Sequence, residues 1–590
     1  MNIAGPERAG NEGASLLDYS GLIPSLLYAG RVWENGSDDG DGGVAEEHEI
    51  RVRVTPRDSE QVNRVFRILT ARINERYTTA ITQSSENPRL VLNVEPSLAA
   101  EAFRIREDGR ATVIEGGSPL GLLYGVGKFL RTSRFEGAFT ASPWRGVSAP
   151  RGSLRGMYFA THFHNWYHVA PENEITRYVE DMALWGVNAI KTAFPFINLR
   201  DWEDPETEHA LTMTRKFART ARDLGLKFAI GINNTMFSGA PSHIRAVRLP
   251  DPTHRRGNSG HPVCPSNPEG RDYLLANARR LFEELSGVGL DLVTFWPYDE
   301  GGCACDRCSP WGCNGFLRLS HDFTELAREY FPNIKTVLST WMFDTPPEGE
   351  WEGLTNALKD GNNWVDYILA DAHEDFPRYP LDVGVPGNLP LVNFPEISMW
   401  GNWPWGGVGA NPLPARFQRL WDQVKHVVRG GFPYSEGIYE DMNKAIVAQF
   451  YWTPERSARD TLREYIAYEF GDKAIEETVA LVEALEMAAT RSYTKQLVDV
   501  GLVRTARELA DKVHEKMPAW ARTGWRWEIL RLRAILDHER FAGEGLATSE
   551  AERALERLIE IYHCEMETDD PYHHRVRPPL ARAVSRRGNL

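Results

Sequence analysis

The chain has 590 residues, which is too long for one ordinary domain and suits three or four domains or one large α/β barrel with additions. Its 67 basic and 82 acidic residues give a net charge of −15, which argues against a protein that coats nucleic acid or an anionic membrane. No run approaches the roughly 18–20 apolar residues of a membrane span, and the first residues lack the basic and apolar regions of an export signal.

The first 150 residues are predicted to consist of a short unpatterned segment and a small domain. Residues 1–47 contain no periodic apolar pattern, and regular structure is predicted only from His48 onward. Residues 48–150 read as a small α+β domain, because alternating strands surround a helix that Ser59 can cap and that runs to about Tyr77. The remaining predicted elements are strands at Arg89–Val94, Ala102–Asp108 and Ala111–Gly116 and a helix at Leu120–Leu130.

Residues 151–455 change to short apolar runs separated by amphipathic helices, which predicts a (β/α)8 barrel (TIM barrel). A doubly wound sheet is the structural alternative, but it would need a glycine-rich phosphate loop after an early strand, and the sequence has none. The eight predicted strands, the last of them weak, are Gly156–Thr161, Val187–Phe194, Leu226–Ile232, Leu290–Trp296, Ile334–Trp341, Val365–Asp371, Leu389–Phe394 and Gly430–Ser435.

Residues 456–590 are predicted to form a C-terminal helical region with a basic tail. The tail, from His573 to Leu590, has five arginines and no acid, and we expect it to be mobile or to pack on the acidic body. The pattern leaves open whether the helices pack on their own barrel or form a homodimer contact. The predicted helices are Ser457–Phe470, Ala474–Ser492, Val503–Glu515, Trp520–Ala542 and Glu550–Tyr562.

Polar and aromatic side chains follow most of the predicted barrel strands. Chemistry in such barrels takes place at the C-terminal ends of the strands, so these side chains are expected on one rim. In strand order they are His162, His164, Asn165, Asn233, Trp296, Tyr298, Asp299, Glu300, Trp341, Asp371, His373, Glu396, Trp400, Trp403, Tyr434 and Glu436.

Carboxylates beside flat rings are the groups that glycoside cleavage requires. One acid protonates the leaving oxygen, a second group attacks or stabilises the anomeric centre, and rings stack on the C–H face of the sugar. Thirteen of the 18 tryptophans lie between Trp166 and Trp452. Barrel packing explains some of them, such as Trp185, but it is a weaker explanation for Trp400 and Trp403, which stand in a loop rich in glycine and proline.

Three features together resemble family 20 β-N-acetylhexosaminidases and the related family 67 and 115 α-glucuronidases: the small α+β domain, Arg155-Gly156 at the start of the barrel, and the Asp299-Glu300 pair. The resemblance covers roughly residues 48–455. In hexosaminidases the Asp orients the acetamido group of the substrate and the Glu is the general acid, which implies these roles for Asp299 and Glu300, with Arg155 at the substrate. In α-glucuronidases later carboxylates activate water, which implies that role for Asp371 and Glu396.

The sequence departs from the hexosaminidase pattern at two places. Trp296-Pro297-Tyr298 stand where hexosaminidases have His-x-Gly-Gly, and the first strand ends in histidines and an asparagine instead of an Asp and a sugar-binding Arg. A uronate site would need a dedicated cation, and Lys191 is the obvious one. The glycosidase class survives these departures, whereas the identity of the sugar stays open.

Four of the six cysteines lie between Cys303 and Cys313, with the spacing of a metal knuckle in Cys303, Cys305 and Cys308. Thiolates suit tetrahedral Zn²⁺, and a closed four-sulfur site would be structural. The fourth ligand is either Cys313 or the remote Cys264, and we favour Cys264 because it would link two loops. The alternative is a loop of free thiols, and the low cysteine count is typical of a reducing, cytoplasmic setting.

The sequence therefore predicts an exo-acting glycoside hydrolase that needs no cofactor for catalysis. Glu300 is the expected general acid, its pKa raised by Asp299 and by burial, and Glu436, Asp371 and Glu396 are candidates for the second carboxylate. A barrel that binds carbohydrate without cleaving it is the alternative of a different class, and a zinc-dependent hydrolase of another bond is the third.

Overall fold

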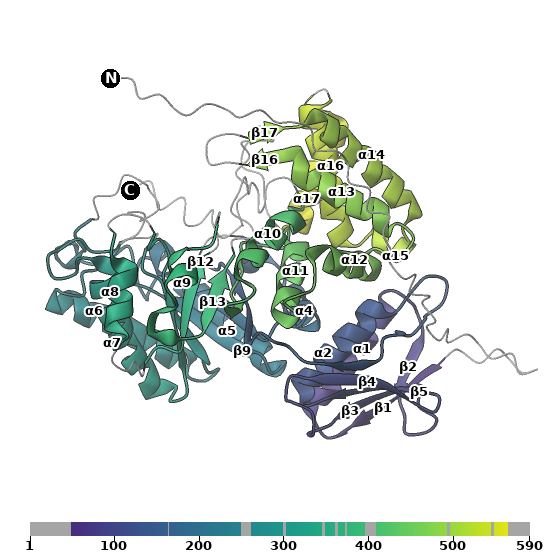
Figure 1. The fold of residues 1–590 in the computed structure, drawn as a ribbon, viewed down its shortest axis with the longest axis horizontal. Helices are drawn as coiled ribbons and strands as arrows, with labels where there is room; N and C mark the ends of the chain where they lie inside the picture. The colour runs from purple at the N-terminus through teal and green to yellow at the C-terminus, as the bar shows by residue number, and fades with distance from the viewer. Residues whose placement is uncertain are drawn as a thin grey trace, which may run out of the picture.

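The computed structural model describes residues 49–162, 165–248, 261–298, 302–344, 348–359, 364–371, 375–395, 409–491, 496–543, 545 and 548–563. These residues form a small α+β unit, a closed barrel and a group of C-terminal helices (Figure 1). The predicted fold class is confirmed. None of the helices in these ranges has the length and apolarity that crossing a bilayer needs.

The N-terminal unit is a six-stranded mixed sheet with two helices. Strand β1 (Glu49–Thr55) alternates exposed and buried residues and pairs in parallel with β2 (Ala80–Gln83) and β3 (Leu90–Val94). The sheet continues through β5 (Ala111–Gly116) to the antiparallel β4 (Phe103–Asp108) and β6 (Gly146–Ser148). Helix α1 (Glu60–Asn74) begins at Ser59, whose Oγ accepts the N–H of Val62 at 3.3 Å, and α2 is Pro119–Thr132. The sequence missed β2 and β6, which are short.

The barrel consists of parallel strands that follow one another in chain order around a closed sheet. The last strand is interrupted: β14 pairs with the first residues of β7, and β15 pairs with its last residues. The interruption falls at Pro433, which has no N–H for a ladder. The strands are β7 (Leu154–Phe159), β8 (Ala189–Ala193), β9 (Lys227–Ile232), β10 (Leu292–Phe295), β11 (Lys335–Ser339), β12 (Tyr367–Asp371), β13 (Leu391–Phe394), β14 (Val428–Gly431) and β15 (Tyr434–Ser435).

Barrel closure depends on a glycine at the seam. Gly430 has a φ of +129° and pairs with Leu154, and a Cβ at this position would lie 1.8 Å from the carbonyl oxygen of Leu154. No other residue type fits there without moving a strand. This explains why the eighth strand has a weak apolar pattern in the sequence.

Amphipathic helices surround the barrel. They are α3 (Trp166–Val169), α4 (Glu172–Leu184), α5 (Pro205–Asp223), α6 (Pro268–Leu285), α7 (Phe316–Tyr330), α8 (Glu350–Ala357), α9 (Tyr379–Asp382), α10 (Pro414–Val424) and α11 (Asp441–Trp452). Most of them bury an apolar face against the strands and expose polar residues, whereas α11 is buried along its whole length and includes the buried Asp441 and Lys444.

The C-terminal region is helical, as predicted, with a small hairpin that the sequence did not reveal. Helix α2 of the N-terminal unit contacts both α4 of the barrel and α12 of the C-terminal region, so the three parts pack together (Figure 1). The elements are α12 (Ala458–Glu469), α13 (Ile475–Ala488), β16 (Ala489–Arg491), β17 (Gln496–Val498), α14 (Val500–Lys516), α15 (Ala519–Arg522), α16 (Trp525–Phe541) and α17 (Ser549–Ile561).

Candidate active site

The C-terminal ends of the barrel strands enclose a cavity of about 260 Å³. This is the end of a (β/α)8 barrel at which chemistry takes place, and the strands supply the walls directly. Side chains that line the cavity are Tyr158, His162, Lys191, Phe194, Asn233, Thr235, Thr294, Trp296, Trp341, Phe394, Tyr434 and Glu436.

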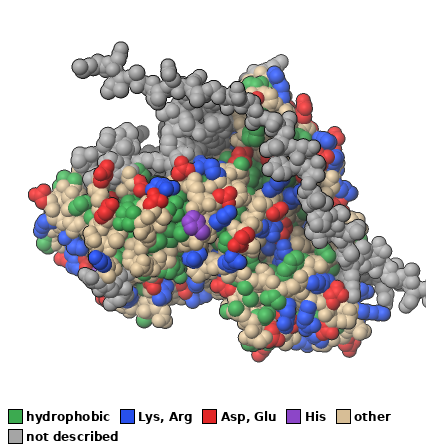
Figure 2. Space-filling view, in the orientation of Figure 1, with side chains coloured by type: hydrophobic (Ala, Val, Ile, Leu, Met, Phe, Trp, Pro, Cys, Tyr) green, Lys and Arg blue, Asp and Glu red, His purple; other side chains and the backbone are tan. Residues whose placement is uncertain are grey.

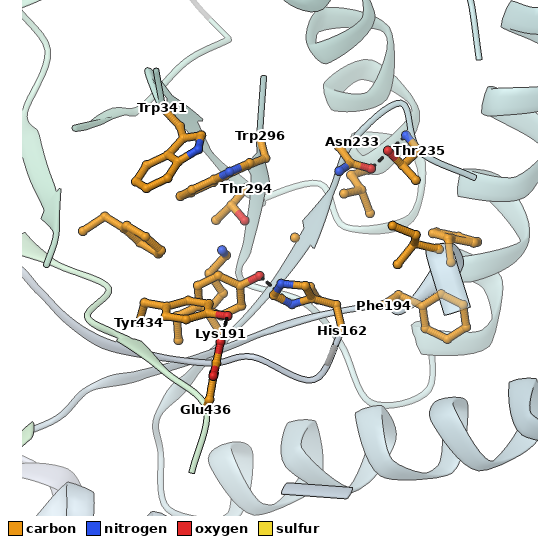
Figure 3. A pocket seen from close by; sticks show the side chains of 17 residues that line it. His162, Lys191, Phe194, Asn233, Thr235, Thr294, Trp296, Trp341, Tyr434 and Glu436 are labelled. Carbon is orange, nitrogen blue, oxygen red and sulfur yellow. Dashed lines mark hydrogen bonds between the residues drawn. The ribbon is translucent and has the colours of Figure 1, made fainter. Parts of the chain in front are cut away.

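Aromatic rings form most of the wall. The ring centroids of Trp296 and Trp341 lie 5.6 Å apart, and the ring of Phe394 lies 4.7 Å from that of Trp296. Tyr158 and Tyr434 meet edge to face at 5.3 Å. In Figure 3 the two tryptophans stand on one side of the cavity and Tyr434 stands on the opposite side. Flat apolar walls of this kind suit the C–H face of a sugar ring.

Among the described residues that line the cavity, Glu436 is the one that carries a carboxyl group, and it follows β15 directly. The hydroxyl of Tyr434 donates a hydrogen bond of 2.7 Å to its Oε1 (Figure 3). Burial raises the pKa of Glu436 to about 7, and the nearby Glu440 adds to this rise, while the Tyr434 hydrogen bond opposes it. The pKa of Tyr434 itself lies well above its usual value because the ring is buried, so its hydroxyl keeps the proton it donates. Glu436 can therefore hold or release a proton near neutral pH.

Lys191 brings a positive charge into the same cavity. It lies on β8, is 1 % exposed, and holds its Nζ 3.2 Å from the centroid of the Tyr158 ring and 5.1 Å from that of Trp296. Burial and the Lys191 charge lower the pKa of His162 to about 3, so this imidazole is neutral. Its Nδ1 lies 3.1 Å from the Tyr158 hydroxyl. The cavity thus combines a buried ammonium, a neutral imidazole and a carboxyl.

The far wall offers hydrogen-bonding groups from the end of β9. Asn233 accepts the backbone N–H of Thr235 at 2.9 Å, and the loop turns there. The Oγ1 of Thr235 is buried and has no hydrogen-bond partner among the described residues. Buried hydroxyl groups normally find a partner, and a hydroxyl of a bound ligand would supply one.

Arg155 does not belong to this cavity, which corrects the role inferred from the resemblance. It is the second residue of β7, at the opposite end of the barrel, and is 1 % exposed. Its guanidinium donates to the carbonyl oxygens of Gly186 at 2.7 Å and Gly152 at 2.8 Å and pairs with Glu101. Arg155 therefore connects the bottom of the barrel to the N-terminal unit.

The side chains of Asn165 and Tyr298 also form hydrogen bonds outside the cavity, and Asp371 does not line it. The Asn165 side chain caps α3, accepting from the N–H of Tyr167 at 3.0 Å and donating to the Ala160 carbonyl at 2.9 Å. The Tyr298 hydroxyl donates to the buried Glu350. Asp371 is the last residue of β12, beside Phe394 in the sheet. The other predicted rim residues, His164, Asp299, Glu300, His373, Glu396, Trp400 and Trp403, lie outside the described residues.

Several lining residues were missed by the sequence analysis because they lie within strands. Tyr158, Thr294 and Phe394 point inward near the strand ends, as alternation of side chains along a strand requires. Tyr158 and Thr294 each lie one residue before the end of their strand, at Phe159 and Phe295.

Four cysteines form a separate cluster beside these strands. The sulfur atoms of Cys264, Cys303, Cys305 and Cys308 all lie within 4.8 Å of one another. Cys313 is not part of this group; its Sγ packs against Gly353. Among the described residues, none of the four sulfurs lines the cavity.

The fold resembles that of solved glycoside hydrolases. No protein-family model and no curated protein sequence matches the chain. BtGH115A, a family GH115 4-O-methyl-α-glucuronidase with specificity for decorated arabinogalactans, aligns over 87 % of this chain and 76 % of its own with a TM-score of 0.56 and 11 % identity. A family 89 enzyme from Clostridium perfringens, solved with GlcNAc-α-1,4-galactose, aligns over 85 % and 64 % with a TM-score of 0.60 and 11 % identity.

A family 20 exo-β-N-acetylglucosaminidase from Vibrio harveyi aligns over 74 % of both chains with a TM-score of 0.49 and 14 % identity. This chain spans less than two thirds of the length of the family 89 enzyme. At such identities the first two alignments establish the fold, with no bearing on the substrate. The described residues therefore share the fold of these two solved enzymes, and in this chain that fold consists of a (β/α)8 barrel with an N-terminal α+β unit and a helical C-terminal region.

Proposed function

We propose that the protein is an exo-acting glycoside hydrolase that removes a terminal sugar from an oligosaccharide or glycoconjugate. The observation that carries this proposal is Glu436, a carboxyl with a pKa of about 7 that faces an aromatic-walled cavity at the C-terminal end of the barrel. A carboxyl of this pKa can donate a proton to the leaving oxygen at neutral pH. The cavity has the size of a monosaccharide pocket more than of a chain-binding cleft, which favours attack at a chain end.

The reaction needs a second group at the anomeric carbon. The sequence predicted Glu300 as the general acid and Glu436 as a candidate second carboxylate. Because Glu436 lines the cavity with a pKa of about 7, we propose the acid role for Glu436 instead, with Glu300 or Asp299, which directly follow Tyr298 after β10, as its partner. Glu396 is another candidate, and Asp371, which ends β12 but does not line the cavity, is the less favoured one. Two carboxyls about 5–5.5 Å apart would retain the anomeric configuration, and a separation of about 6.5–9.5 Å would invert it. No cofactor takes part in this chemistry, and we place the protein in the cytoplasm on the basis of its cysteine usage.

Two classes of substrate are candidates: a terminal N-acetylhexosamine and a terminal uronic acid. The resemblance to hexosaminidases points to a terminal N-acetylhexosamine. The ammonium of Lys191 lines the cavity beside Tyr158 and Trp296, where it could bind the carboxylate of a sugar, as in an α-glucuronidase. A terminal uronic acid is therefore the second candidate substrate.

A panel of aryl glycosides tests both the activity and the substrate. It should contain α- and β-linked N-acetylhexosamines, neutral hexoses and glucuronic acid, and we expect turnover of at least one member. If the substrate is a uronide, Lys191→Met should raise its KM by about tenfold or more, with Lys191→Arg as the charge-preserving control. Tight sugar binding without turnover of any member would contradict the hydrolase and support the carbohydrate-binding barrel.

A further inference from the structure

The cysteine cluster has the dimensions of a metal site with four sulfur ligands. The Sγ of Cys264 lies 3.8 Å from that of Cys305 and 3.9 Å from that of Cys308. Zinc–sulfur bonds are about 2.3 Å long, so the edge of a regular ZnS4 tetrahedron is about 3.8 Å. The sulfurs therefore stand at the separation that one tetrahedral ion would impose, and too far apart for a disulfide.

Hydrogen-bond donors and a cation lie beside the cysteine cluster. Backbone N–H groups of Ser266 and Asn267 donate to Cys264, and the Ser266 hydroxyl lies 3.0 Å from the Sγ of Cys308. The guanidinium of Arg318 donates to the Ser266 hydroxyl at 3.1 Å and to the carbonyl oxygen of Arg307 at 2.5 Å, which brings a positive charge against both cysteine loops. N–H donors and a nearby cation stabilise negative charge on sulfur.

The two loops of the cluster are attached to neighbouring parts of the cavity wall. On one side, the N–H of Val263 donates to the carbonyl of Asn234 at 2.9 Å, so the residue before Cys264 is held to the loop after β9 that contains Asn233 and Thr235. On the other side, Cys303 follows β10 and Trp296 in the chain. A metal ion between the loops would therefore link the wall segments that follow β9 and β10.

We propose that Cys264, Cys303, Cys305 and Cys308 bind one structural Zn²⁺ that clips the loop after β9 to the loop after β10. The coordination is closed by four sulfurs, which leaves no position for water or substrate, so the ion stabilises the wall of the cavity and takes no part in the reaction. Cys303 comes only three residues after Glu300 in the sequence, so the clip is close in the chain to the proposed partner of Glu436. The proposal does not depend on the proposed hydrolase activity.

Metal analysis of the purified full-length protein tests this directly. We expect about one equivalent of zinc per chain, released when the thiols are modified by a mercurial, and a lower Tm for the metal-free protein. Cys264→Ser and Cys308→Ser should each lower the zinc content. Cys313→Ser is the matched control, because this thiol lies outside the cluster, and it should keep the full content.

Replacement of the zinc by Co²⁺ gives a second readout, which does not require the variants to fold. We expect the absorption of tetrahedral tetrathiolate cobalt. Zinc well below about one equivalent with freely titratable thiols, iron in its place, or a cobalt spectrum of higher coordination number would overturn the proposal. Loss of zinc from Cys313→Ser to the same degree as from Cys264→Ser would also contradict the assignment of the fourth ligand.

Discussion

Glu436 and Tyr434 are two residues apart, and their side chains form one unit at the cavity wall. Burial pushes the pKa of Glu436 up to about 7, and the hydrogen bond from Tyr434 holds it below the value that burial alone would give. The pair therefore sets the pH at which the carboxyl is protonated. A change at either residue should therefore change the pH dependence of the reaction rate.

Replacing Tyr434 with phenylalanine removes the hydrogen bond and keeps the ring. Because the bond favours the charged carboxylate, its loss raises the pKa of Glu436, and the limb of the pH–rate profile that Glu436 controls should move to higher pH. The maximal rate should fall by less than about tenfold, because the variant loses the stabilisation of a single hydrogen bond. The profile of kcat/KM against pH measures the shift. Tyr158→Phe is the control, because its hydroxyl contacts His162, and a profile that moves equally in both variants would contradict this account.

The sequence predicted some of the site residues and misplaced others for identifiable reasons. Trp296, Trp341 and Tyr434 were found because residues at strand ends reach the rim of a barrel, and the structure places them at the cavity. Asn165 was assigned to the sugar because its capping of a four-residue helix leaves no periodic signal. Tyr298 was misplaced because its partner, Glu350, is 52 residues away in the sequence.

At the scale of elements, the two ends of strand β7 have different roles, one at the cavity and one in holding the barrel together. Tyr158, near the C-terminal end, lines the cavity, whereas Arg155, near the N-terminal end, holds backbone carbonyls at the bottom of the barrel. The barrel itself could be predicted from the repeated apolar runs. The role of a charged residue in such a strand depends on its position along the strand. Arg155 is the second residue of β7, and its substrate role was inferred from the resemblance alone.

Arg155→Ala should therefore affect stability and not substrate binding. It would leave the carbonyl oxygens of Gly186 and Gly152 without this donor, and we expect a loss of about 3 kcal/mol in the free energy of unfolding with an unchanged KM. Urea denaturation and steady-state kinetics on the same preparation measure the two quantities. Arg151→Ala, at an exposed ion pair with Glu455, is the neutral control. A raised KM with unchanged stability would contradict this account and support a role for Arg155 in substrate binding.

At the scale of the whole molecule, a buried ionic network joins all three parts. Asp181 of α4 accepts from Arg72 of α1 at 2.9 Å and from Arg526 of α16 at 2.9 Å, and Arg526 also donates to Asp441 of α11 at 2.7 Å. Burial alone would raise the pKa of Asp181, but the guanidinium groups of Arg72, Arg177 and Arg526 hold it well below its usual value. The network thus fixes the N-terminal unit and the helical region against the barrel.

On the face of the molecule shown in Figure 2, acidic and basic side chains are interspersed, so the net charge of −15 forms no single patch there.

Asp181→Asn tests the network. A lowered carboxyl pKa contributes stability above the pKa of the unfolded chain, and that stability is lost as the pH falls through the pKa of the folded state. We expect the variant to lose about 3–5 kcal/mol at pH 7, since two buried guanidinium groups each lose one of their carboxylate partners, and its stability to depend less on pH in acid. Asp422→Asn, an exposed residue that pairs with Lys425, should change stability by less than about 0.5 kcal/mol. Equal stability of Asp181→Asn and the wild type at pH 7 would contradict a structural role.

The central claim is that Glu436 transfers the proton in glycoside cleavage, and the turnover of a Glu436→Gln variant tests it most directly. On the glycoside that the wild type cleaves best, kcat should fall by about 10²–10⁴-fold, and the loss should be smaller for an aryl leaving group that needs no protonation. Glutamine keeps the size of the side chain, so circular dichroism and Tm should show an intact fold. A folded Glu436→Gln variant that cleaves its substrate at the wild-type rate would contradict the claim.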